Sequence, residues 1–322
     1  MAHRAPTEHH DDEPTATAAD DRPGLQAIAG GTGFLGRVKT FVALCKPRVI
    51  ELLLITTVPA MVLAANGWPR TSLVIAVLIG GTCSAGGANA VNSFLERDRD
   101  QLMRRTRRRP LPSRTISPRT ALGFGLVLEA IAFAILWSTA NLLAALLALA
   151  SALFYVFVYT IWLKPRTDQN IVIGGAAGAG PVLVGWAAVT GSLAAPAWVL
   201  FALVFMWTPA HFWALAIRYL DDYRSGGFPM LPVTRGVKAA TDQIVIYAAA
   251  TVCVSLLLPF VATVHALYLG TATLLGAWFV FESLRLRRNP EPSAAIRLFS
   301  ISNVYLAGTF IALAADVILL GR

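Results

Sequence analysis

Long apolar segments follow one another along most of this chain and limit what it can fold into. Of its 322 residues, 56% are hydrophobic and 14% are charged, and the mean hydropathy is +0.61. Soluble domains usually carry about 25% charged residues, and a helix that crosses a bilayer needs about 20 mainly apolar residues. The sequence therefore predicts an all-α, polytopic membrane protein: a bundle of nine transmembrane helices around a central cavity open to the cytoplasmic face. The predicted spans are residues 49–66, 72–95, 118–138, 141–163, 170–190, 196–218, 241–261, 265–284 and 297–320.

Positive charge is confined to one set of the connections between these spans. Apart from Arg70 and Arg322, the Lys and Arg residues lie in or at the edges of residues 1–48, 96–117, 164–169, 219–240 and 285–296. Cytoplasmic loops of membrane proteins are rich in Lys and Arg, so we expect these connections and the N-terminus to lie in the cytoplasm. A net charge of +9 arranged in this way argues against nucleic acid as a partner and for a lipid bilayer. We expect a multi-pass protein of the inner (plasma) membrane of a bacterium.

The start of the chain differs in composition from the rest. Residues 1–41 are polar, rich in Ala, Thr, Asp, Pro and Gly, and contain no apolar run of signal-peptide length. Such a segment cannot bury enough apolar surface to order itself. We predict a disordered cytoplasmic tail over residues 1–41 and a single membrane domain over residues 42–322.

A column of oxygen-bearing side chains ends the second predicted span. Asn92, Glu96 and Asp100 are four residues apart, and each such step turns a helical side chain by only about 40°, so the three share one face. Asp98 falls off that face. Carboxylate and amide oxygens are hard ligands that suit Mg²⁺. The pattern predicts a magnesium site, unless these acids only solvate the end of the helix.

Arginines follow this column at once, among them Arg105 and Arg109. Guanidinium groups bind phosphate oxygens in a forked geometry, so Mg²⁺ ligands beside arginines predict a diphosphate ester as the ligand. The alternative is that the arginines only mark the cytoplasmic side. Four cations of two other inner connections can likewise bind phosphate or only mark the cytoplasmic side. These cations are Lys46, Arg48, Lys164 and Arg166.

A second group of ionisable residues lies at the end of the sixth predicted span. If the helix continues, His211, Arg218 and Asp222 lie within about 20° of one another, with Asp221 about 100° away. An ionisable residue inside a membrane span is costly and usually functional, although His211 could instead be an interior histidine bonded to a carbonyl. The segments after the second and sixth spans both run from acids through arginine to a pair of prolines. We expect both to face one cavity.

Together these residues resemble the UbiA-type intramembrane prenyltransferase superfamily, typified by 4-hydroxybenzoate polyprenyltransferase. Within it the chain is similar to the protohaem IX farnesyltransferase (haem O synthase) branch. The resemblance covers about residues 42 to 320. Its matching positions are Asn92, Glu96, Asp98, Asp100, Met103, Arg105, Thr106, Arg109, Tyr159, Thr160, Leu163, Lys164, Thr167, Asn170, Gly174, Gly175, Pro181, His211, Phe212, Trp213, Asp222, Tyr223, Met230, Leu231 and Pro232.

The resemblance implies an enzyme that transfers a farnesyl group from farnesyl diphosphate to the vinyl group of protohaem IX (haem B), giving haem O. It implies a Mg²⁺ cofactor held by the catalytic residues Asn92, Glu96, Asp100 and Asp222. His211 would contact the haem, Arg218 a propionate, and haem A synthase is a candidate partner for handing on the product. The implied substrate-binding residues are Lys46, Arg48, Arg105, Arg109, Tyr159, Lys164, Arg166, Asn170, His211, Arg218 and Asp221.

Three alternatives stay open at this point. A prenyltransferase of the same type could act on a quinone precursor or chlorophyllide. A transporter or haem carrier could use as many spans, but it has no need of acids followed by arginines at two inner helix ends. A phosphatidyl transferase of the CDP-alcohol type also uses membrane carboxylates, but its D-G-x-x-A-R signature is absent from this sequence.

Overall fold

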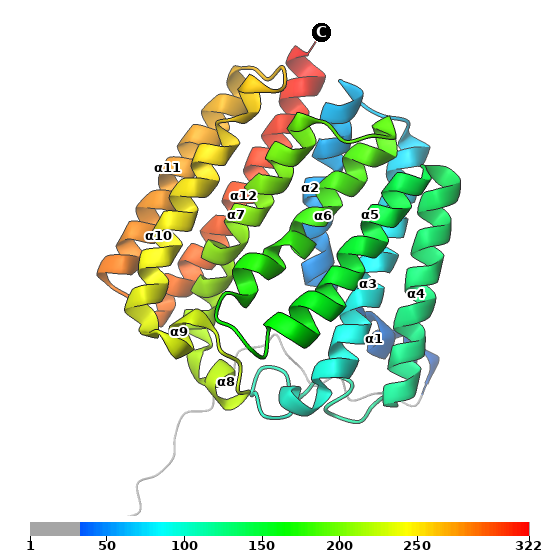
Figure 1. The fold of residues 1–322 in the computed structure, drawn as a ribbon, viewed down its shortest axis with the longest axis vertical. Helices are drawn as coiled ribbons and strands as arrows, with labels where there is room; N and C mark the ends of the chain where they lie inside the picture. Colours follow the sequence, from blue (N-terminus) through cyan, green and yellow to red (C-terminus); the bar gives the residue numbers. More distant parts are fainter. Residues whose placement is uncertain (1–32, 322) are drawn as a thin grey trace, which may run out of the picture.

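The computed structural model describes residues 33–321, apart from the side chains of residues 48, 49, 52 and 53. Regular secondary structure in this part of the chain is helical, as predicted (Figure 1). The elements are α1 (Phe34–Cys45), α2 (Pro47–Ala65), α3 (Thr71–Asp100), α4 (Pro118–Thr139), α5 (Leu142–Leu153), the π-helix η1 (Phe154–Leu163), α6 (Asn170–Thr190), α7 (Ala195–Arg218), α8 (Leu220–Ser225), α9 (Leu231–Thr234), α10 (Gly236–Ser255), the 3₁₀ turn η2 (Leu258–Phe260), α11 (Ala266–Arg288) and α12 (Pro292–Leu320).

Eight helical stretches of the described residues are long and apolar enough to cross a membrane. They are residues 71–100, 118–139, 142–163, 170–190, 195–218, 236–260, 266–288 and 292–320, and each matches one predicted span. The chain is therefore a multi-pass membrane protein. The first predicted span, 49–66, corresponds to α2, in which the described apolar stretch is shorter (Leu54–Ala65). A count of nine crossings remains a prediction.

Neighbours in the bundle are not always neighbours in sequence. The last helix, α12, packs against both α2 and α7, and α2 packs against α6, so the two ends of the membrane domain are joined. Figure 1 shows α10 and α11 on one side of this centre and α3 and α4 on the other. The longest connection, residues 101–117, lies with α8 and α9 at one end of the bundle, away from the C-terminus.

The segment before α2 differs from the prediction. Residues 1–32 lie outside the described residues, so a disordered tail there is untested. From Phe34 on, however, the chain forms α1, which packs against α3. The side-chain amide of Asn89 helps to hold its end, because Nδ2 donates to the carbonyl oxygen of Cys45 (2.9 Å). Composition had suggested a tail up to residue 41, but the apolar residues from Phe34 onward are already helical.

Helices α3 and α4 approach each other through two glycines. A Cβ atom added to Gly87 would lie 2.7 Å from the carbonyl oxygen of Gly125, and one added to Gly125 would lie 2.9 Å from that of Gly87. Small residues of this kind allow membrane helices to pack closely. The carboxyl group of Glu129 lies beside Gly87, and its Oε2 accepts a hydrogen bond from the Ser84 hydroxyl (3.1 Å). Glu129, an acid near the middle of a predicted span, therefore has Ser84 of α3 as a hydrogen-bond partner.

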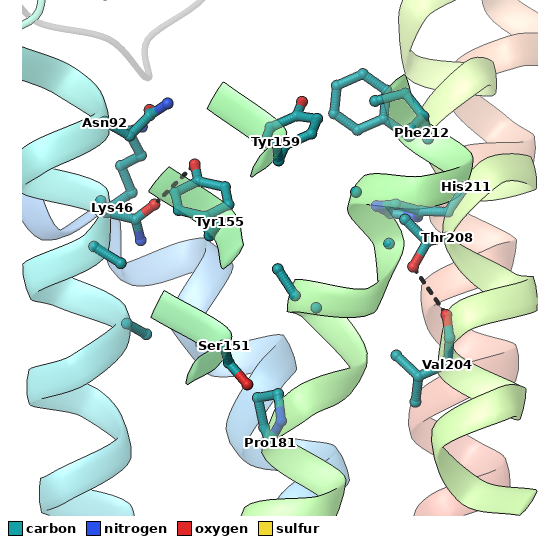
Figure 2. Close-up of a pocket in the computed structure, with 18 of the residues that line it drawn as sticks. Lys46, Asn92, Ser151, Tyr155, Tyr159, Pro181, Val204, Thr208, His211 and Phe212 are labelled. Atoms are coloured by element: carbon teal, nitrogen blue, oxygen red, sulfur yellow. Dashed lines mark hydrogen bonds between the residues drawn. The ribbon is translucent and has the colours of Figure 1, made fainter. Parts of the chain in front are cut away.

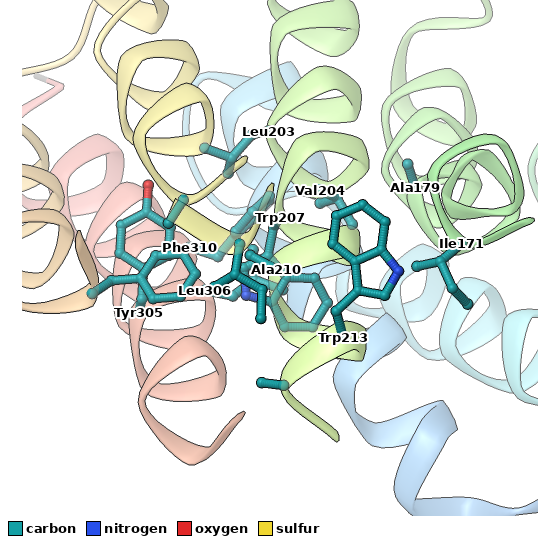
Figure 3. Packing of buried hydrophobic residues seen from close by; sticks show 14 of the residues in the cluster. Ile171, Ala179, Leu203, Val204, Trp207, Ala210, Trp213, Tyr305, Leu306 and Phe310 are labelled. Carbon is teal, nitrogen blue, oxygen red and sulfur yellow. The ribbon is translucent and has the colours of Figure 1, made fainter. Parts of the chain in front are cut away.

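Large aromatic side chains fill the second half of the bundle. Trp213, Tyr268, Tyr305, Phe279 and Phe310 are almost fully buried among α7, α10, α11 and α12. Figure 3 shows several of these residues, together with Trp207, packed between α7 and α12. The dense packing on this side gives α7 and α12 a rigid common wall, which faces the more open first half of the bundle.

We expect Gly125→Ala to destabilise the protein by about 1–3 kcal/mol, because the new methyl group would overlap the backbone of α3. The matched control is Gly123→Ala on the same helix, where an added Cβ meets no atom within 4 Å. Thermal unfolding of both purified variants in detergent measures the difference. Equal melting temperatures for the two would contradict the close approach of α3 and α4.

Candidate active site

A large cavity lies between the two halves of the bundle. Its volume is about 650 Å³, within the range of ligand pockets, and its walls come from α2, α3, α5, η1, α6, α7 and α12. Figure 2 shows Lys46, Asn92, Tyr155 and Tyr159 on one side and Thr208, His211 and Phe212 of α7 on the other. Charged lining residues come chiefly from the end of α3 and the segments beside it; they include Lys46, Glu96, Asp100, Arg105, Arg109 and Lys164.

The acid column of the sequence lies on the cavity wall. Helix α3 continues to Asp100, beyond the predicted end at residue 95, so Asn92, Glu96 and Asp100 occupy one helical face. All three are buried and line the cavity. The side chain of Asp98 is 78% exposed, which agrees with its predicted position off this face. The four-residue spacing was therefore sufficient to identify which oxygens share a site.

Each member of the column contacts one of the predicted phosphate-binding cations. Lys164 Nζ forms an ion pair with Glu96 Oε1, and Arg109 Nη1 lies 3.0 Å from Asp100 Oδ2. Lys46 Nζ donates to Asn92 Oδ1 at 2.6 Å. A buried carboxylate left without a partner is destabilising, so these pairs stabilise the cavity wall. They also bring three cations from separate parts of the chain to one wall.

Lys46 reaches this wall from an unusual backbone conformation. It has φ 54° and ψ 63°, in the left-handed region, and it separates α1 from α2. Burial, and secondarily the positive charge of Arg109, lower the pKa of Lys46 to about 7. A non-glycine residue in this region usually marks a constrained site. Here the backbone turn places the ammonium group at the cavity.

The π-helix η1 supplies the next part of the wall. Its last five-residue turn is closed where Lys164 N donates to the carbonyl oxygen of Tyr159 (2.8 Å). The side-chain hydroxyl of Thr160 donates to the carbonyl oxygen of Tyr155 (2.9 Å). Thr160 Oγ1 also accepts from Asn92 Nδ2 (3.0 Å). Tyr155, Tyr159 and Lys164 all line the cavity as a result. Short π-helical segments are frequent at functional sites. Neither Tyr155 nor Thr160 had been selected as a site residue.

The second group of ionisable residues, at the end of the sixth predicted span, is arranged differently from the expectation. Helix α7 ends at Arg218, since Tyr219 leaves helical geometry (φ −113°, ψ 35°), and α8 begins at Leu220. The helical wheel therefore holds for His211 and Arg218 but is wrong for Asp222, which lies beyond the end of α7. The segment after α7 does reach the cavity, but through Tyr223 and Phe228. Phe228 lies under the ammonium group of Lys164, with Nζ 4.5 Å from the ring centroid.

Asp222 lies just outside the cavity and holds the turn that follows α3. Its two carboxylate oxygens accept hydrogen bonds from the backbone N–H groups of Arg104 and Arg105, both at 3.1 Å. The guanidinium of Arg105 then lies 5.3 Å from the ring centroid of Tyr219 and lines the cavity. The C-terminal ends of α3 and α7 thus do converge, with Asp222 as the link between the segments that follow them.

Several other predicted site residues do not line the cavity. Arg166 turns back to donate to the carbonyl oxygens of Ile161 and Trp162 (2.8 and 3.0 Å). Asn170 is buried and donates to the carbonyl oxygens of Thr167 and Pro229, so it ties two loops together. Arg218 and Asp221 are exposed. The side chain of Arg48 lies outside the described residues.

His211 does line the cavity, one turn of α7 from Thr208. Its Nδ1 lies 2.8 Å from the hydroxyl oxygen of Ser302 on α12, so its partner is not the carbonyl that a structural histidine would be expected to have. Asn303, next to Ser302, also lines the cavity, and its Oδ1 is buried with no hydrogen-bond partner among the described residues. Sequence patterns gave no signal for Ser302 or Asn303, because both belong to a long apolar helix.

The oxygen ligands at this site do not form a complete metal cage. In the described part of the chain, no group of three or more His, Cys, Asp and Glu residues is arranged to hold a metal ion. Glu96, Asp100 and the amide of Asn92 are two carboxylates and one neutral oxygen. Mg²⁺ is usually bound by one or two carboxylates together with phosphate oxygens of a substrate, so this donor set fits a metal ion that arrives with a diphosphate.

Comparison with known proteins places the chain among prenyltransferases. The model of the UbiA prenyltransferase family matches residues 53–308. Proteins named protoheme IX farnesyltransferase are similar over most of the chain. The Clavibacter michiganensis protein is 49% identical over 290 residues, which cover 89% of this chain and 95% of that protein. A protein of Thermus thermophilus is 50% identical over 293 residues, 91% of this chain, but the chain spans only about half (48%) of its length.

Solved structures show the same fold. A digeranylgeranylglyceryl phosphate synthase has a TM-score of 0.72 at 18% identity, covering 88% of this chain and 99% of that one. A UbiA homologue from Archaeoglobus fulgidus, bound to DMAPP and Mg²⁺, has a TM-score of 0.58 at 16% identity, with coverage of 85% and 99%. At these identities the likeness concerns the helical arrangement alone.

We expect Asp222→Ala to loosen the turn at residues 104–105, because two backbone N–H groups lose their acceptor. Losing such hydrogen bonds costs about 1–3 kcal/mol, so trypsin should cleave within residues 104–109 about tenfold faster. Asp221→Ala is the matched control, since the Asp221 side chain is 92% exposed and pairs with the exposed Arg224. Equal cleavage rates in the two variants would show that Asp222 does not hold the turn.

Proposed function

The chain belongs to the UbiA prenyltransferase family, and we propose that it transfers a farnesyl group from farnesyl diphosphate to the vinyl group of protohaem IX. Relatives that are about 50% identical over most of the chain carry the name of this activity. The observation that supports it most directly is the meeting of the α3 acid column with Lys46, Arg105, Arg109 and Lys164 in one cavity. A diphosphate ester with its metal ion requires these two kinds of group side by side.

We propose that Asn92, Glu96 and Asp100 hold Mg²⁺ beside the diphosphate. The ion would neutralise charge on the departing diphosphate as the allylic C–O bond breaks. Asp222, placed in this set by the resemblance, is engaged with the backbone of Arg104 and Arg105 and does not line the cavity. It is therefore the member with the least structural support. A dependence of activity on Mg²⁺ that is unchanged in Asp222→Asn would exclude it as a ligand.

The cations of the wall bind the diphosphate in this proposal. Lys164, Arg109 and Lys46 would exchange their present partners on α3 for phosphate oxygens, while the carboxylates they leave turn to the metal ion. No charge is then left unpaired, which matters in a cavity surrounded by membrane helices. Arg105, held by the Asp222 turn, adds a fourth cation that has no carboxylate partner among the described residues.

The deeper part of the cavity is suited to the farnesyl chain. Its apolar lining there includes Ile55, Val77, Ala148, Pro181, Val184 and Leu306. A dry, apolar surrounding protects an allylic carbocation from premature capture by water. Tyr155 and Tyr159, which stack on each other with ring centroids 5.6 Å apart, lie between this region and the cations. The reacting carbon would therefore lie beside aromatic rings.

The acceptor is proposed to lie on the opposite wall, against α7 and α12, where His211 faces the cavity. The relatives share the name of one acceptor, which favours protohaem over a quinone precursor or chlorophyllide. A transporter or haem carrier would not require a diphosphate site. Arg218 is exposed and does not line the cavity, so contact with a propionate is not part of the proposal.

The positions of the Lys and Arg residues support a proposal for the membrane location and orientation of the chain. We propose an inner (plasma) membrane location in a bacterium, with the N-terminus and the cation-rich end of the cavity at the cytoplasmic face. The proposal also includes transfer of the product to a partner protein such as haem A synthase. Incubating the purified chain with farnesyl diphosphate, protohaem and Mg²⁺, and measuring the mass of the haem product, tests the activity itself.

We expect Glu96→Gln and Asp100→Asn each to lower turnover by about 100-fold or more. Each removes a negatively charged ligand of the metal ion that would stabilise the departing diphosphate. Asp98→Asn is the matched control: it is a carboxylate of the same helix end, but it points away from the cavity. Turnover is measured at equal amounts of membrane-inserted protein. A loss in Asp98→Asn as large as in the other two would contradict the column.

We expect Lys164→Met to raise the KM for farnesyl diphosphate by about tenfold, since one charged hydrogen bond to phosphate contributes about 1.5–3 kcal/mol. Arg166→Met, two residues away, should leave KM unchanged because its guanidinium donates only to backbone carbonyls of η1. Steady-state kinetics at saturating protohaem separates the two. If the arginine variant is the more impaired, the assignment of the cations is wrong.

A further inference from the structure

The imidazole of His211 is held by contacts on both α7 and α12. It stacks on Trp207 with ring centroids 4.1 Å apart and on Phe299 of α12 at 4.3 Å. Its Nδ1 lies 2.8 Å from Ser302 Oγ. Trp207 is fixed in turn, since its Nε1 donates to the carbonyl oxygen of Ser302 (2.8 Å). The ring can therefore neither rotate nor move away from the cavity without breaking several contacts.

The hydrogen bonds around Ser302 define which nitrogen of His211 carries the proton. Ser302 Oγ lies 2.7 Å from the carbonyl oxygen of Phe299. A carbonyl oxygen only accepts, so the single hydroxyl proton of Ser302 must be donated to it. Ser302 Oγ can then only accept from His211, and Nδ1 must be the N–H donor. In the neutral imidazole, Nε2 is left unprotonated, with a free lone pair.

Among the described residues His211 is hydrogen-bonded through Nδ1 and not through Nε2, and His211 lines the cavity. Resting on the proposed function, we propose that His211 Nε2 ligates the iron of the protohaem substrate. A neutral imidazole nitrogen is a common axial ligand of haem iron. A partner on the other ring nitrogen is what orients such a ligand and raises its basicity. Ligation here forms one N–Fe bond and releases no proton.

The position of His211 also suits the chemistry. It lies on the α7 wall, across the cavity from Tyr155, Tyr159 and Asn92 (Figure 2). A macrocycle anchored by its iron on this wall leaves its periphery, where the vinyl groups are, directed toward the side that holds the diphosphate. One ring nitrogen, Nδ1, is thus fixed by Ser302, and the other, which has no hydrogen bond to a described residue, belongs to a ring that lines the cavity.

The test is a titration of the full-length protein in detergent with ferric protohaem, followed by optical and EPR spectra. The purification tag must contain no histidine. We expect a histidine-ligand spectrum for the unchanged chain, and for His211→Ala its loss with binding weakened by about tenfold or more. Added imidazole should restore the spectrum by filling the vacated space. The matched control is His265→Ala, because His265 is bonded to Asp316 and does not line the cavity.

A second variant covers the case in which His211→Ala fails to fold. Ser302→Ala removes the acceptor of Nδ1–H, so we expect the Fe–His stretching band of the ferrous complex to shift in the resonance Raman spectrum while haem still binds. Unchanged spectra in both variants would overturn the proposal and leave the transfer reaction intact. If the unchanged chain neither binds protohaem nor yields product, it is the proposed function that fails.

Discussion

The pairing of buried carboxylates with cations on the cavity wall is the interaction on which the rest of this structure depends. Glu96 and Asp100 end a membrane-spanning helix and are buried, where an unpaired charge would be strongly destabilising. Two features that look separate serve these pairs: the last five-residue turn of η1, which carries Lys164, and the loop that returns Arg109 to Asp100. The left-handed backbone of Lys46 brings a third cation to the neighbouring Asn92. Each brings a cation to α3 from a different part of the chain.

The same pairs prepare the site for its proposed ligand. A cavity whose fixed acids are already matched by bases can accept a metal ion and a diphosphate by exchanging partners, with little change in total charge. The remainder of the cavity is arranged around that end, with apolar residues deeper in the bundle and the histidine of α7 opposite. The rigid aromatic packing between α7 and α12 holds this histidine at one position.

The sequence predicted those features that repeat with a regular period. Apolar length located the spans, and the four-residue spacing of Asn92, Glu96 and Asp100 placed them correctly on one face. The same reasoning failed after Arg218, because a helical wheel assumes a continuous helix and Tyr219 ends it. The π-helix could not be predicted either, since its residues are ordinary apolar and aromatic ones. Phe228 and Ser302 act through contacts with distant segments, which no local pattern records.

A structure of the protein with Mn²⁺ and a non-hydrolysable farnesyl thiolodiphosphate would test the central claim most directly. Anomalous scattering locates the metal ion independently of the surrounding density. The account predicts that the metal ion lies within coordination distance of Glu96 and Asp100, with Lys164 and Arg109 moved onto phosphate oxygens. A metal ion bound elsewhere, with the Lys164–Glu96 and Arg109–Asp100 pairs unchanged, would contradict it.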